Sequence, residues 1–282
     1  MKFVLLLLAL FSLPVRAGTL AQFRTVFGDI EVELYDQDKP VTVQNFLHYV
    51  RSGAYQNMFL HRCVPGFVIQ GGGFSVSDRA GTNDATLFSS VTNYGTITNE
   101  FNVGTPQSNV FGTIAMAKLG GDPNSASSQW FFNLADNSTN LDNQNGGFTV
   151  FGRVVRGTNV LNQVNNLSKG NGVVDLRWWF GDQASTFSDL PVDYTGFAYP
   201  QYADLIYLDV SPLNVQVRST DQGAREISWN SVSNKLNHVE FTTNLPPWWQ
   251  TLISTNGTGN TLQVVDDGAV DARRFYRVRV EY

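Results

Sequence analysis

Two segments of the chain hold residues whose types and spacing could do chemistry. Residues 60–74 contain Arg62 and Gln70, and residues 112–133 contain a second block of apolar and polar residues. A guanidinium is charged at every working pH and presents a planar fork of N–H donors, so it can hydrogen bond a carbonyl oxygen or an amide nitrogen. A single arginine is more often half of a surface salt bridge. The residues around Arg62 are therefore needed to decide between a hydrogen-bond donor in a functional site and half of a surface salt bridge.

Other residue types predict no further chemistry. The run Gly71–Gly73 lacks the Gly-Lys-Ser/Thr ending and the following helix of a phosphate-binding loop. His48, His61 and His238 are scattered without the spacing of metal ligands, so we expect structural histidines, no metal and no cofactor. The single cysteine, Cys63, excludes an internal disulfide. We expect its side chain to point into the interior and to be inert.

The two segments closely resemble the cyclophilins, the cyclosporin-binding class of peptidyl-prolyl cis-trans isomerases. The shared pattern is His-Arg-x-x-Pro-Gly-Phe-x-x-Gln-Gly-Gly, then Ala-Met-Ala, then Ser-Gln-aromatic-Phe, then aromatic-x-Val-Phe-Gly at residues 148–152. The order and spacing of four separate blocks match. The similarity runs from about residue 19 to residue 210 and is closest to bacterial short-loop members. It implies a mainly β fold, an eight-stranded antiparallel barrel capped by two helices.

The resemblance implies a reaction without a covalent step. Rotation about an X–Pro bond has a barrier of about 18–20 kcal/mol and takes roughly tens to hundreds of seconds. A rate of about 10³ per second needs an acceleration near 10⁵, or about 7 kcal/mol. The transition state is a twisted amide whose nitrogen has regained its lone pair, so a donor aimed at that nitrogen stabilises only the twisted form. By resemblance, Arg62 is this donor and Gln70 acts beside it.

The resemblance also implies which residues bind the substrate, a proline-containing polypeptide. Gln70 and Gln129 match the glutamines that hold the substrate backbone and orient the arginine. Ala117 and Lys118 match the edge that pairs with an extended peptide, where the second residue is commonly Asn. The apolar slot for the proline ring is matched by Phe67, Met116, Phe131, Leu141 and Phe148.

Two positions depart from the family pattern. Asn140 stands where many members carry a tryptophan that strengthens cyclosporin binding more than catalysis, so we expect weak drug binding with retained isomerase activity. Phe148 stands where eukaryotic members have His and bacterial members often have Tyr. It keeps the hydrophobic wall but loses the polar tip, which bears on the rate and not on the reaction class.

Periodicity predicts the elements that must position these residues. Ile30, Val32 and Leu34 alternate with polar residues, the period of a half-buried strand within residues 23–35. Pro40 opens a helix with apolar residues at helical spacing, and residues 158–167 form a second helix. The irregular stretch 71–109 is long enough to be functional. Further strands are predicted at 58–70 (a pair broken at Pro65-Gly66), 110–118, 129–134, 148–155 and 204–210.

The composition and the first residues limit the class of protein. The 282 residues are 42% hydrophobic and only 15% charged, and the net charge of −5 argues against a nucleic-acid partner. Lys2, a short apolar run and Ala17 predict a signal peptide over residues 1–17, cleaved on export to a periplasm or out of the cell. The apolar run is shorter than the roughly 20 residues of a membrane span, so an anchor is the weaker alternative.

The chain changes character after the predicted isomerase-like domain, residues 18–211. Residues 212–282 show short alternating runs punctuated by turn residues, which predicts a small β-sandwich that resembles fibronectin-type modules, with an unknown partner. Before it, residues 171–203 are longer than expected and contain Trp178-Trp179, for which core packing and ligand stacking both stay open. We expect a monomer.

The leading hypothesis is an exported folding catalyst that accelerates rotation about X–Pro bonds in exported proteins. One alternative is a weakly active or inactive scaffold that binds peptides with the same fold. Another is a surface-binding protein in which the C-terminal sandwich does the work. The intact Arg62, Phe67, Gln70 and Phe131 favour the enzyme.

Overall fold

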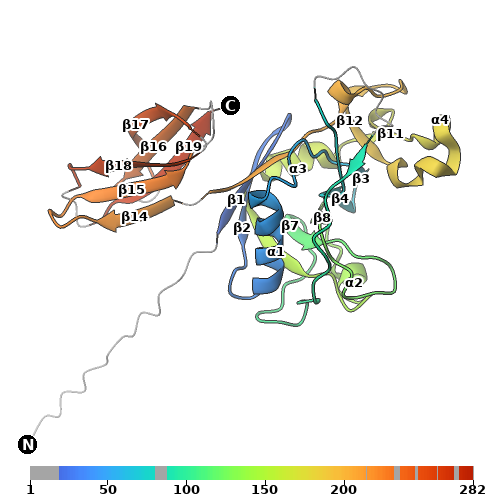
Figure 1. The fold of residues 1–282 in the computed structure, drawn as a ribbon, viewed down its shortest axis with the longest axis horizontal. Coiled ribbons are helices and arrows are strands. Elements are labelled where there is room, and N and C mark those ends of the chain that lie inside the picture. The colour runs from blue at the N-terminus through green and yellow to red at the C-terminus, as the bar shows by residue number, and fades with distance from the viewer. Residues whose placement is uncertain are drawn as a thin grey trace, which may run out of the picture.

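The structure, a computed structural model, describes residues 19–79, 88–213, 215–231, 236–244, 247–258, 260–269 and 273–281. The predicted signal peptide lies outside these ranges. Within them, no helix combines the length and apolar character needed to cross a membrane. The dominant element is an antiparallel sheet of eight strands in the order β13-β1-β2-β9-β7-β8-β4-β3 (Figure 1). Its strands are β1 (Leu20–Thr25), β2 (Gly28–Leu34), β3 (Arg62–Val64), β4 (Val68–Gly71), β7 (Thr113–Met116), β8 (Trp130–Asn133), β9 (Val150–Arg156) and β13 (Asp209–Leu213).

The residues that alternate in the sequence form strand β2 as predicted, and β2 pairs with β1 in an antiparallel hairpin. Ile30, Val32 and Leu34 are buried, while the residues between them stay partly exposed. Gly28 opens β2 with φ +121°, a conformation that residues with a side chain rarely adopt. The mainly β fold with an eight-stranded antiparallel sheet is therefore confirmed.

The curled sheet closes through a short bridge and not through a ladder between its edge strands, β3 and β13. The Leu60 N–H donates to the Ile206 carbonyl at 2.9 Å, and the Leu208 N–H donates to the Met58 carbonyl at 3.1 Å. The predicted strand 204–210 is thus corrected, because the ladder begins only at Asp209. Alternating apolar residues are common to a bridging segment and to a strand, so periodicity cannot separate them.

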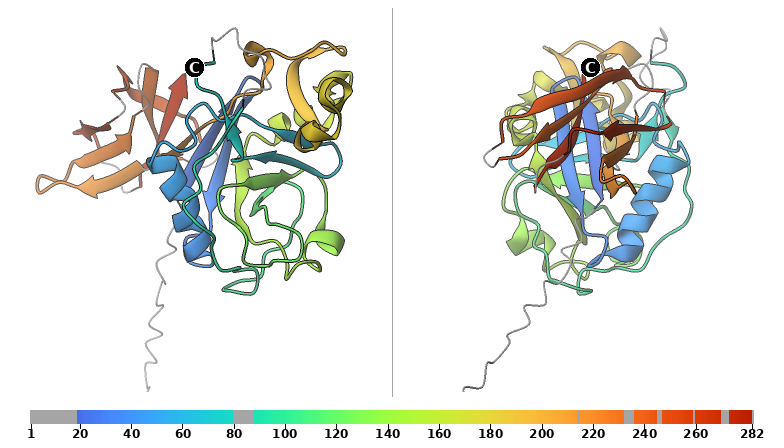
Figure 2. Two further views of the ribbon diagram at one scale, coloured as in Figure 1. Left: turned by 45° about the vertical axis from the view of Figure 1, so that its right-hand side comes forward. Right: turned by 90° about the vertical axis from the view of Figure 1, so that its left-hand side faces the viewer.

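Two helices pack on the sheet, α1 (Pro40–Arg51) and α3 (Thr158–Asn165). In both turned views α1 lies against the strands β1 and β2 (Figure 2). Its buried face contributes Val43, Phe46 and Leu47 to the main core, where Phe23 and Trp130 stack edge to face at 5.2 Å. Aromatic rings thus pack together with aliphatic side chains in the main core.

The first turn of α1 is capped from a distant loop. The Glu100 carboxylate accepts hydrogen bonds from the backbone N–H groups of Val41 and Thr42, at 3.1 and 2.7 Å. In return, the buried Lys39 ammonium donates to the carbonyls of Glu100 and Phe101. Helix N-termini carry unsatisfied N–H groups and favour an anion. This exchange therefore fixes the loop at residue 100 to the helix.

Cys63 lies inside the sheet, as expected. It is 1% exposed, and burial raises the pKa of its thiol to about 12. A thiol in this state is a poor nucleophile at neutral pH.

The segment after α3 builds a second, smaller core. Its buried residues include Val174, Leu190 and Leu205, which pack against Phe59 and Val76 from the barrel. The segment comprises β10 (Ser168–Lys169), β11 (Asn171–Val174), α4 (Arg177–Phe180), the 3-10 turns η1 (Gly181–Phe187) and η2 (Tyr202–Asp204), and β12 (Leu190–Thr195). Short elements elsewhere are α2 (Ser138–Leu141), β5 (Phe74–Ser75) and β6 (Ser89–Ser90).

The described residues after β13 form two three-stranded antiparallel sheets, β14-β15-β18 and β17-β16-β19. A small cluster joins them, with Ile227 and Trp229 from one sheet and Val239 from the other. Within it the Trp229 indole N–H donates to the Asn237 side-chain oxygen at 3.2 Å. The six strands are β14 (Val215–Ser219), β15 (Arg225–Asn230), β16 (Leu236–Thr242), β17 (Gln250–Asn256), β18 (Thr261–Asp266) and β19 (Phe275–Glu281).

Candidate functional site

The registers of four adjacent strands bring a row of side chains to one face of the sheet. Arg62 on β3 lies opposite Gln70 on β4, Gln70 lies opposite Phe131 on β8, and Phe131 lies opposite Ala115 on β7. Residues directly opposite in an antiparallel pair have their side chains on the same side. A cation, an amide and an aromatic ring that are far apart in sequence thus become neighbours.

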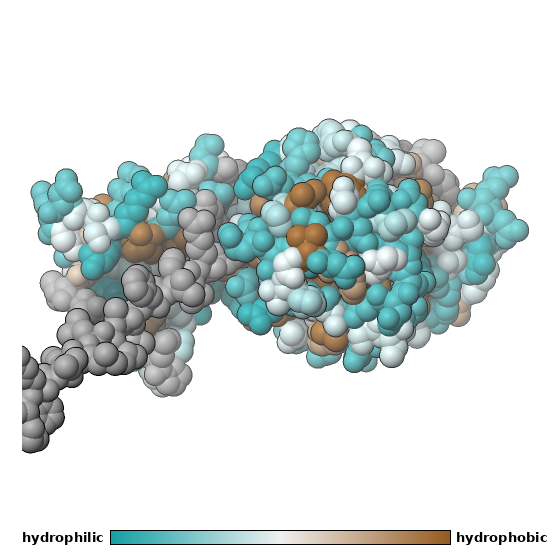
Figure 3. Space-filling model, turned by 90° about the horizontal axis from the view of Figure 1, so that it is seen from below, coloured by the Kyte–Doolittle hydropathy of each residue, from teal (hydrophilic) through white to brown (hydrophobic). Residues whose placement is uncertain are grey.

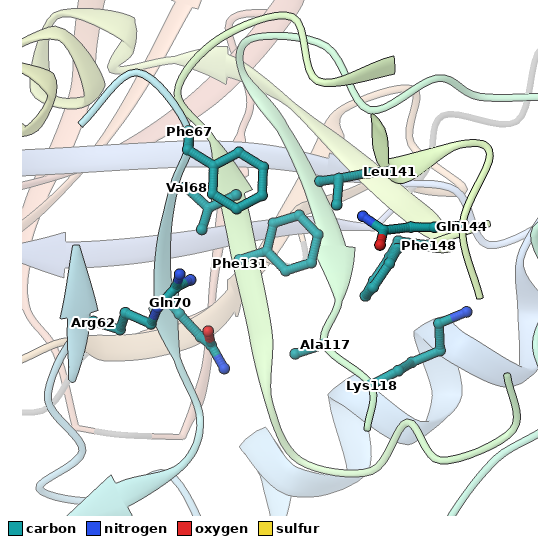
Figure 4. A pocket seen from close by; sticks show the side chains of 10 residues that line it. All are labelled: Arg62, Phe67, Val68, Gln70, Ala117, Lys118, Phe131, Leu141, Gln144 and Phe148. Atoms are coloured by element: carbon teal, nitrogen blue, oxygen red, sulfur yellow. The ribbon is translucent and has the colours of Figure 1, made fainter. Parts of the chain in front are cut away.

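This row borders a pocket of about 230 Å³. Figure 4 shows Phe131 at its centre, Arg62 and Gln70 on one side, and Leu141 and Phe148 on the other. Phe131 and Phe148 contact at 5.9 Å between ring centroids in a T-shaped arrangement. The complete lining is Arg62, Phe67, Val68, Gln70, Ala117, Lys118, Phe131, Leu141, Gln144 and Phe148. The wall is apolar, with the polar groups at its rim.

Eight of the ten sequence-predicted site residues line this pocket, and two do not. Gln129 lies beside it and lines an adjoining hollow. Met116 is 1% exposed and belongs to the main core on the other side of β7. Strand alternation explains this position, because Ala115 and Ala117 occupy the pocket side and Met116 must point the opposite way.

A chain of amides runs behind the arginine. The Gln70 side-chain N–H donates to the Gln129 side-chain oxygen at 2.6 Å. His61, which is 1% exposed, lies close to the Gln129 side chain, since both approach Gly73. Burial, together with the nearby charge of Arg62, lowers the pKa of His61 to about 3. The ring is therefore neutral at any ordinary pH and acts as a fixed support for Gln129.

Buried asparagines hold the two walls of the pocket. Asn109 donates to the Phe148 carbonyl at 2.9 Å, and Asn137 donates to the Phe67 carbonyl at 2.8 Å. Asn133 connects the two, since it donates to Asn109 and accepts from Asn137. Three buried side-chain amides form this network. It ties the turn of Phe67 and the loop of Phe148 to the end of β8.

Lys118 makes contacts that the sequence did not predict. Its ammonium donates to the carbonyls of Asn145 and Gly147, at 2.7 and 2.6 Å, and lies 4.7 Å from the centre of the Phe148 ring. Burial lowers the pKa of Lys118 to about 8, and Asp122 acts in the opposite direction. The lysine is thus bound to the loop that forms one wall of the pocket.

The sequence analysis missed two lining residues, Val68 and Gln144. Val68 lies two residues before Gln70 on β4, so alternation could have placed it on the pocket face. Gln144 lies in a loop and bonds the Asn140 side chain, one turn after α2. Nothing in the sequence pattern marks such a loop residue. Among the described residues, no three His, Cys, Asp or Glu side chains are grouped to hold a metal ion.

Replacing Asn109 by alanine tests the asparagine network. Asn109 is fully buried, and its loss leaves the Phe148 carbonyl and an Asn133 N–H unpaired. We expect Asn109→Ala to lower the free energy of unfolding by about 2–3 kcal/mol. Urea unfolding followed by tryptophan fluorescence measures the change. The matched control is Asn143→Ala at an exposed amide, expected within about 0.5 kcal/mol of wild type. Equal stability of the two variants would contradict the role of the network.

Comparison with known proteins matches the barrel portion of the chain to one family. The family model of the cyclophilin type peptidyl-prolyl cis-trans isomerases matches residues 20–177. A peptidyl-prolyl cis-trans isomerase of Acinetobacter baylyi is 35% identical over 159 residues, which are 56% of this chain and 78% of that protein.

Two further bacterial relatives show a similar extent. Peptidyl-prolyl cis-trans isomerase A of Dickeya dadantii is 38% identical over 149 residues, 52% of this chain and 71% of the relative. Peptidyl-prolyl cis-trans isomerase B of Escherichia coli is 36% identical over 152 residues, 52% of this chain and 85% of the relative. The chain therefore belongs to the cyclophilin-type peptidyl-prolyl cis-trans isomerases and is an enzyme of this class.

Proposed function

We propose that Arg62 is the catalytic group, acting as a hydrogen-bond donor to the prolyl amide of a substrate held in the pocket. The row of Arg62, Gln70 and Phe131 across three strands carries this proposal. It sets a permanently charged donor at the rim of an apolar pocket of residue size. In such a site, a proline ring can lie against Phe131 with its amide bond directed to the guanidinium.

The chemistry follows from the difference between the planar and the twisted amide. In the planar form the nitrogen lone pair is delocalised and accepts poorly. In the twisted form it is localised, and a charge-assisted N–H bond to it is strong. Because the donor binds the twisted form better, it lowers the barrier and does not merely tighten binding.

Gln70 and Gln129 orient the reacting groups. Since the Gln70 N–H₂ is bound by Gln129, the Gln70 carbonyl oxygen is directed away as an acceptor for the guanidinium or the substrate backbone. The neutral ring of His61 supports Gln129 from behind. Ala117 and Lys118 offer the edge along which an extended substrate would lie. Met116 takes no part in this proposal because of its place in the core.

We further propose that the enzyme is exported and assists the folding of exported proteins. Support comes from the apolar run and Ala17 of the predicted signal peptide, residues 1–17. We propose two domains, residues 18–211 as the isomerase and residues 212–282 as a fibronectin-like β-sandwich. The cluster shared by the two C-terminal sheets supports this division. No binding partner is assigned to this β-sandwich.

Removal of the guanidinium tests the catalytic assignment. We expect Arg62→Ala to lower kcat/KM on a short Ala-Pro peptide by about 10²–10³-fold, the usual loss for one preorganised donor. A protease-coupled or NMR exchange assay of cis–trans interconversion measures the rate. The matched control is Arg153→Ala, which removes an exposed arginine on β9 that pairs with Glu33 on β2 and should leave the rate unchanged.

Two outcomes would count against this assignment. Equal rates for wild type and Arg62→Ala would remove Arg62 from the mechanism. A wild-type rate no faster than the spontaneous one, with peptide binding retained, would favour the scaffold alternative.

Lys118 predicts a pH dependence of the rate. With a pKa of about 8, its ammonium is mostly charged at pH 7 and mostly neutral at pH 9. Because burial disfavours the charged ammonium, loss of its proton removes this cost, so the loop of Asn145 and Gly147 is held more firmly as pH rises. We expect kcat/KM to rise about two- to fivefold between pH 7 and pH 9.5, a change of roughly 1 kcal/mol at most.

A pH–rate profile with two variants checks this expectation. Lys118→Arg keeps the charge and Lys118→Met has none, so both variants should remove the rise. A wild-type profile that is flat over this range would show that protonation of Lys118 does not affect the pocket.

A further inference from the structure

Five aromatic side chains gather on the surface of the segment that follows α3. This aromatic patch comprises Trp178, Trp179, Phe180, Phe197 and Tyr199. Trp178 is 56% exposed and Trp179 is 38% exposed, so neither tryptophan of the pair is the buried core residue that one interpretation of the sequence expected. On the face in Figure 3, by contrast, hydrophobic residues occupy small areas surrounded by hydrophilic ones. A contiguous exposed aromatic surface of this kind marks an interaction site.

The exposed rings are held in place. The Phe197 ring lies over Gly170, where an added Cβ would come within 2.3 Å of the ring. The Gly196 N–H donates to the Gly170 carbonyl at 2.7 Å and anchors the turn that carries Phe197. Ring-to-ring contacts at 4.8–6.0 Å then connect all five side chains. The aromatic patch is therefore preorganised, because the Phe197 ring can occupy its position only above a glycine.

The rings meet at steep angles. Trp178 is inclined by 47° to Trp179 and by 40° to Phe197, and Tyr199 is inclined by 81° to Trp179. A sugar ring stacks best on one flat aromatic face. Inclined rings form notches between them, which fit the projecting rings of a polyproline II helix, the form recognised by aromatic-lined grooves.

The charges of the segment favour a cationic partner. Residues 168–204 contain five aspartates against two cations, Lys169 and Arg177. Both cations form ion pairs with Asp175, at 3.4 and 2.7 Å. Asp182, which closely follows Phe180, is exposed. Anionic lipid surfaces and nucleic acids attract positive charge, so this surplus of carboxylates disfavours both.

The patch lies outside the part of the chain that matches the family, on a segment that also contacts the strand of Arg62. The match ends at residue 177. The segment reaches β3 through the Cys63 N–H, which donates to the Asp189 carbonyl at 2.7 Å. In Figure 1, α4 lies on the same side of the barrel as β3. A polypeptide engaged at the pocket could therefore have a second part near the patch.

We propose that the aromatic patch is a second binding surface for polypeptide clients, selecting extended proline-rich segments that carry lysine or arginine. The proposal goes beyond the isomerase pocket, which handles one X–Pro bond, and rests only on the enzyme acting on polypeptides. Prolines would fill the notches between the inclined rings, and the cationic side chains would face Asp182. The patch would raise the local concentration of a client without touching the reacting bond.

The test measures binding of a fluorescent twelve-residue peptide of Pro, Leu and Lys to the full-length protein by polarisation. We expect Trp178→Ser and Asp182→Lys each to weaken binding about five- to tenfold. A peptide with Glu in place of Lys should bind at least tenfold more weakly than the Lys peptide. The matched control is Trp248→Ser, which removes a tryptophan that is 83% exposed in the C-terminal part and should leave binding unchanged.

A second measurement separates this surface from the pocket. None of the three variants should change kcat/KM on a short Ala-Pro peptide, so the isomerase assignment stands or falls independently. Asp182→Lys changes only an exposed side chain and keeps the test valid if Trp178→Ser is poorly folded. Unchanged binding in both patch variants, or equal binding of the Glu peptide, would overturn the proposal. So would indole N–H signals of Trp178 that shift with a hexasaccharide or with anionic vesicles but not with the peptide.

Discussion

The antiparallel register of β3, β4, β8 and β7 is the constraint on which the site depends. It aligns Arg62, Gln70 and Phe131 on one face, although the three residues come from segments up to 69 positions apart. Because side chains alternate along a strand, a slip of one residue in any pairing would turn one of them into the core. The backbone hydrogen bonds of the sheet thus position the donor, the orienting amide and the floor of the pocket together.

Loops form the remaining walls of the pocket, and buried polar groups hold these loops in place. The asparagine network binds the carbonyls of Phe67 and Phe148, and Lys118 binds the loop just before Phe148. A buried donor without a partner is costly, so such networks are rigid once every member is satisfied. The apolar walls of the pocket therefore owe their positions to polar contacts behind them, in the same way that Gln70 owes its orientation to Gln129 and His61.

Most of the site could be predicted from the sequence because four blocks of residues resemble the cyclophilin pattern in order and spacing. The prediction was wrong where the direction of a side chain, and not its residue type, decides whether the residue lines the pocket. Met116 has the chemistry of a pocket residue, but alternation along β7 turns it inward, and Val68 shows the reverse case. The sequence predicts Lys118 only as part of the edge that pairs with a peptide, since its carbonyl partners lie in a loop whose path no periodicity describes. The same limit applies to the exposed rings of Trp178 and Phe197.

The sequence by itself determined the reaction class, the strand and helix pattern of the barrel, and the residues able to act as donor and apolar slot. The reaction class and the site residues follow from the resemblance of the motif blocks to one family, and the strand and helix pattern follows from short-range periodicity. Only the tertiary structure decided which side chains meet, how the edge strands are bridged at residues 58–60 and 206–208, and that five aromatic rings share one surface. The physical reason is that register, loop path and side-chain facing are set by contacts between distant segments, for which a linear pattern holds no local signal.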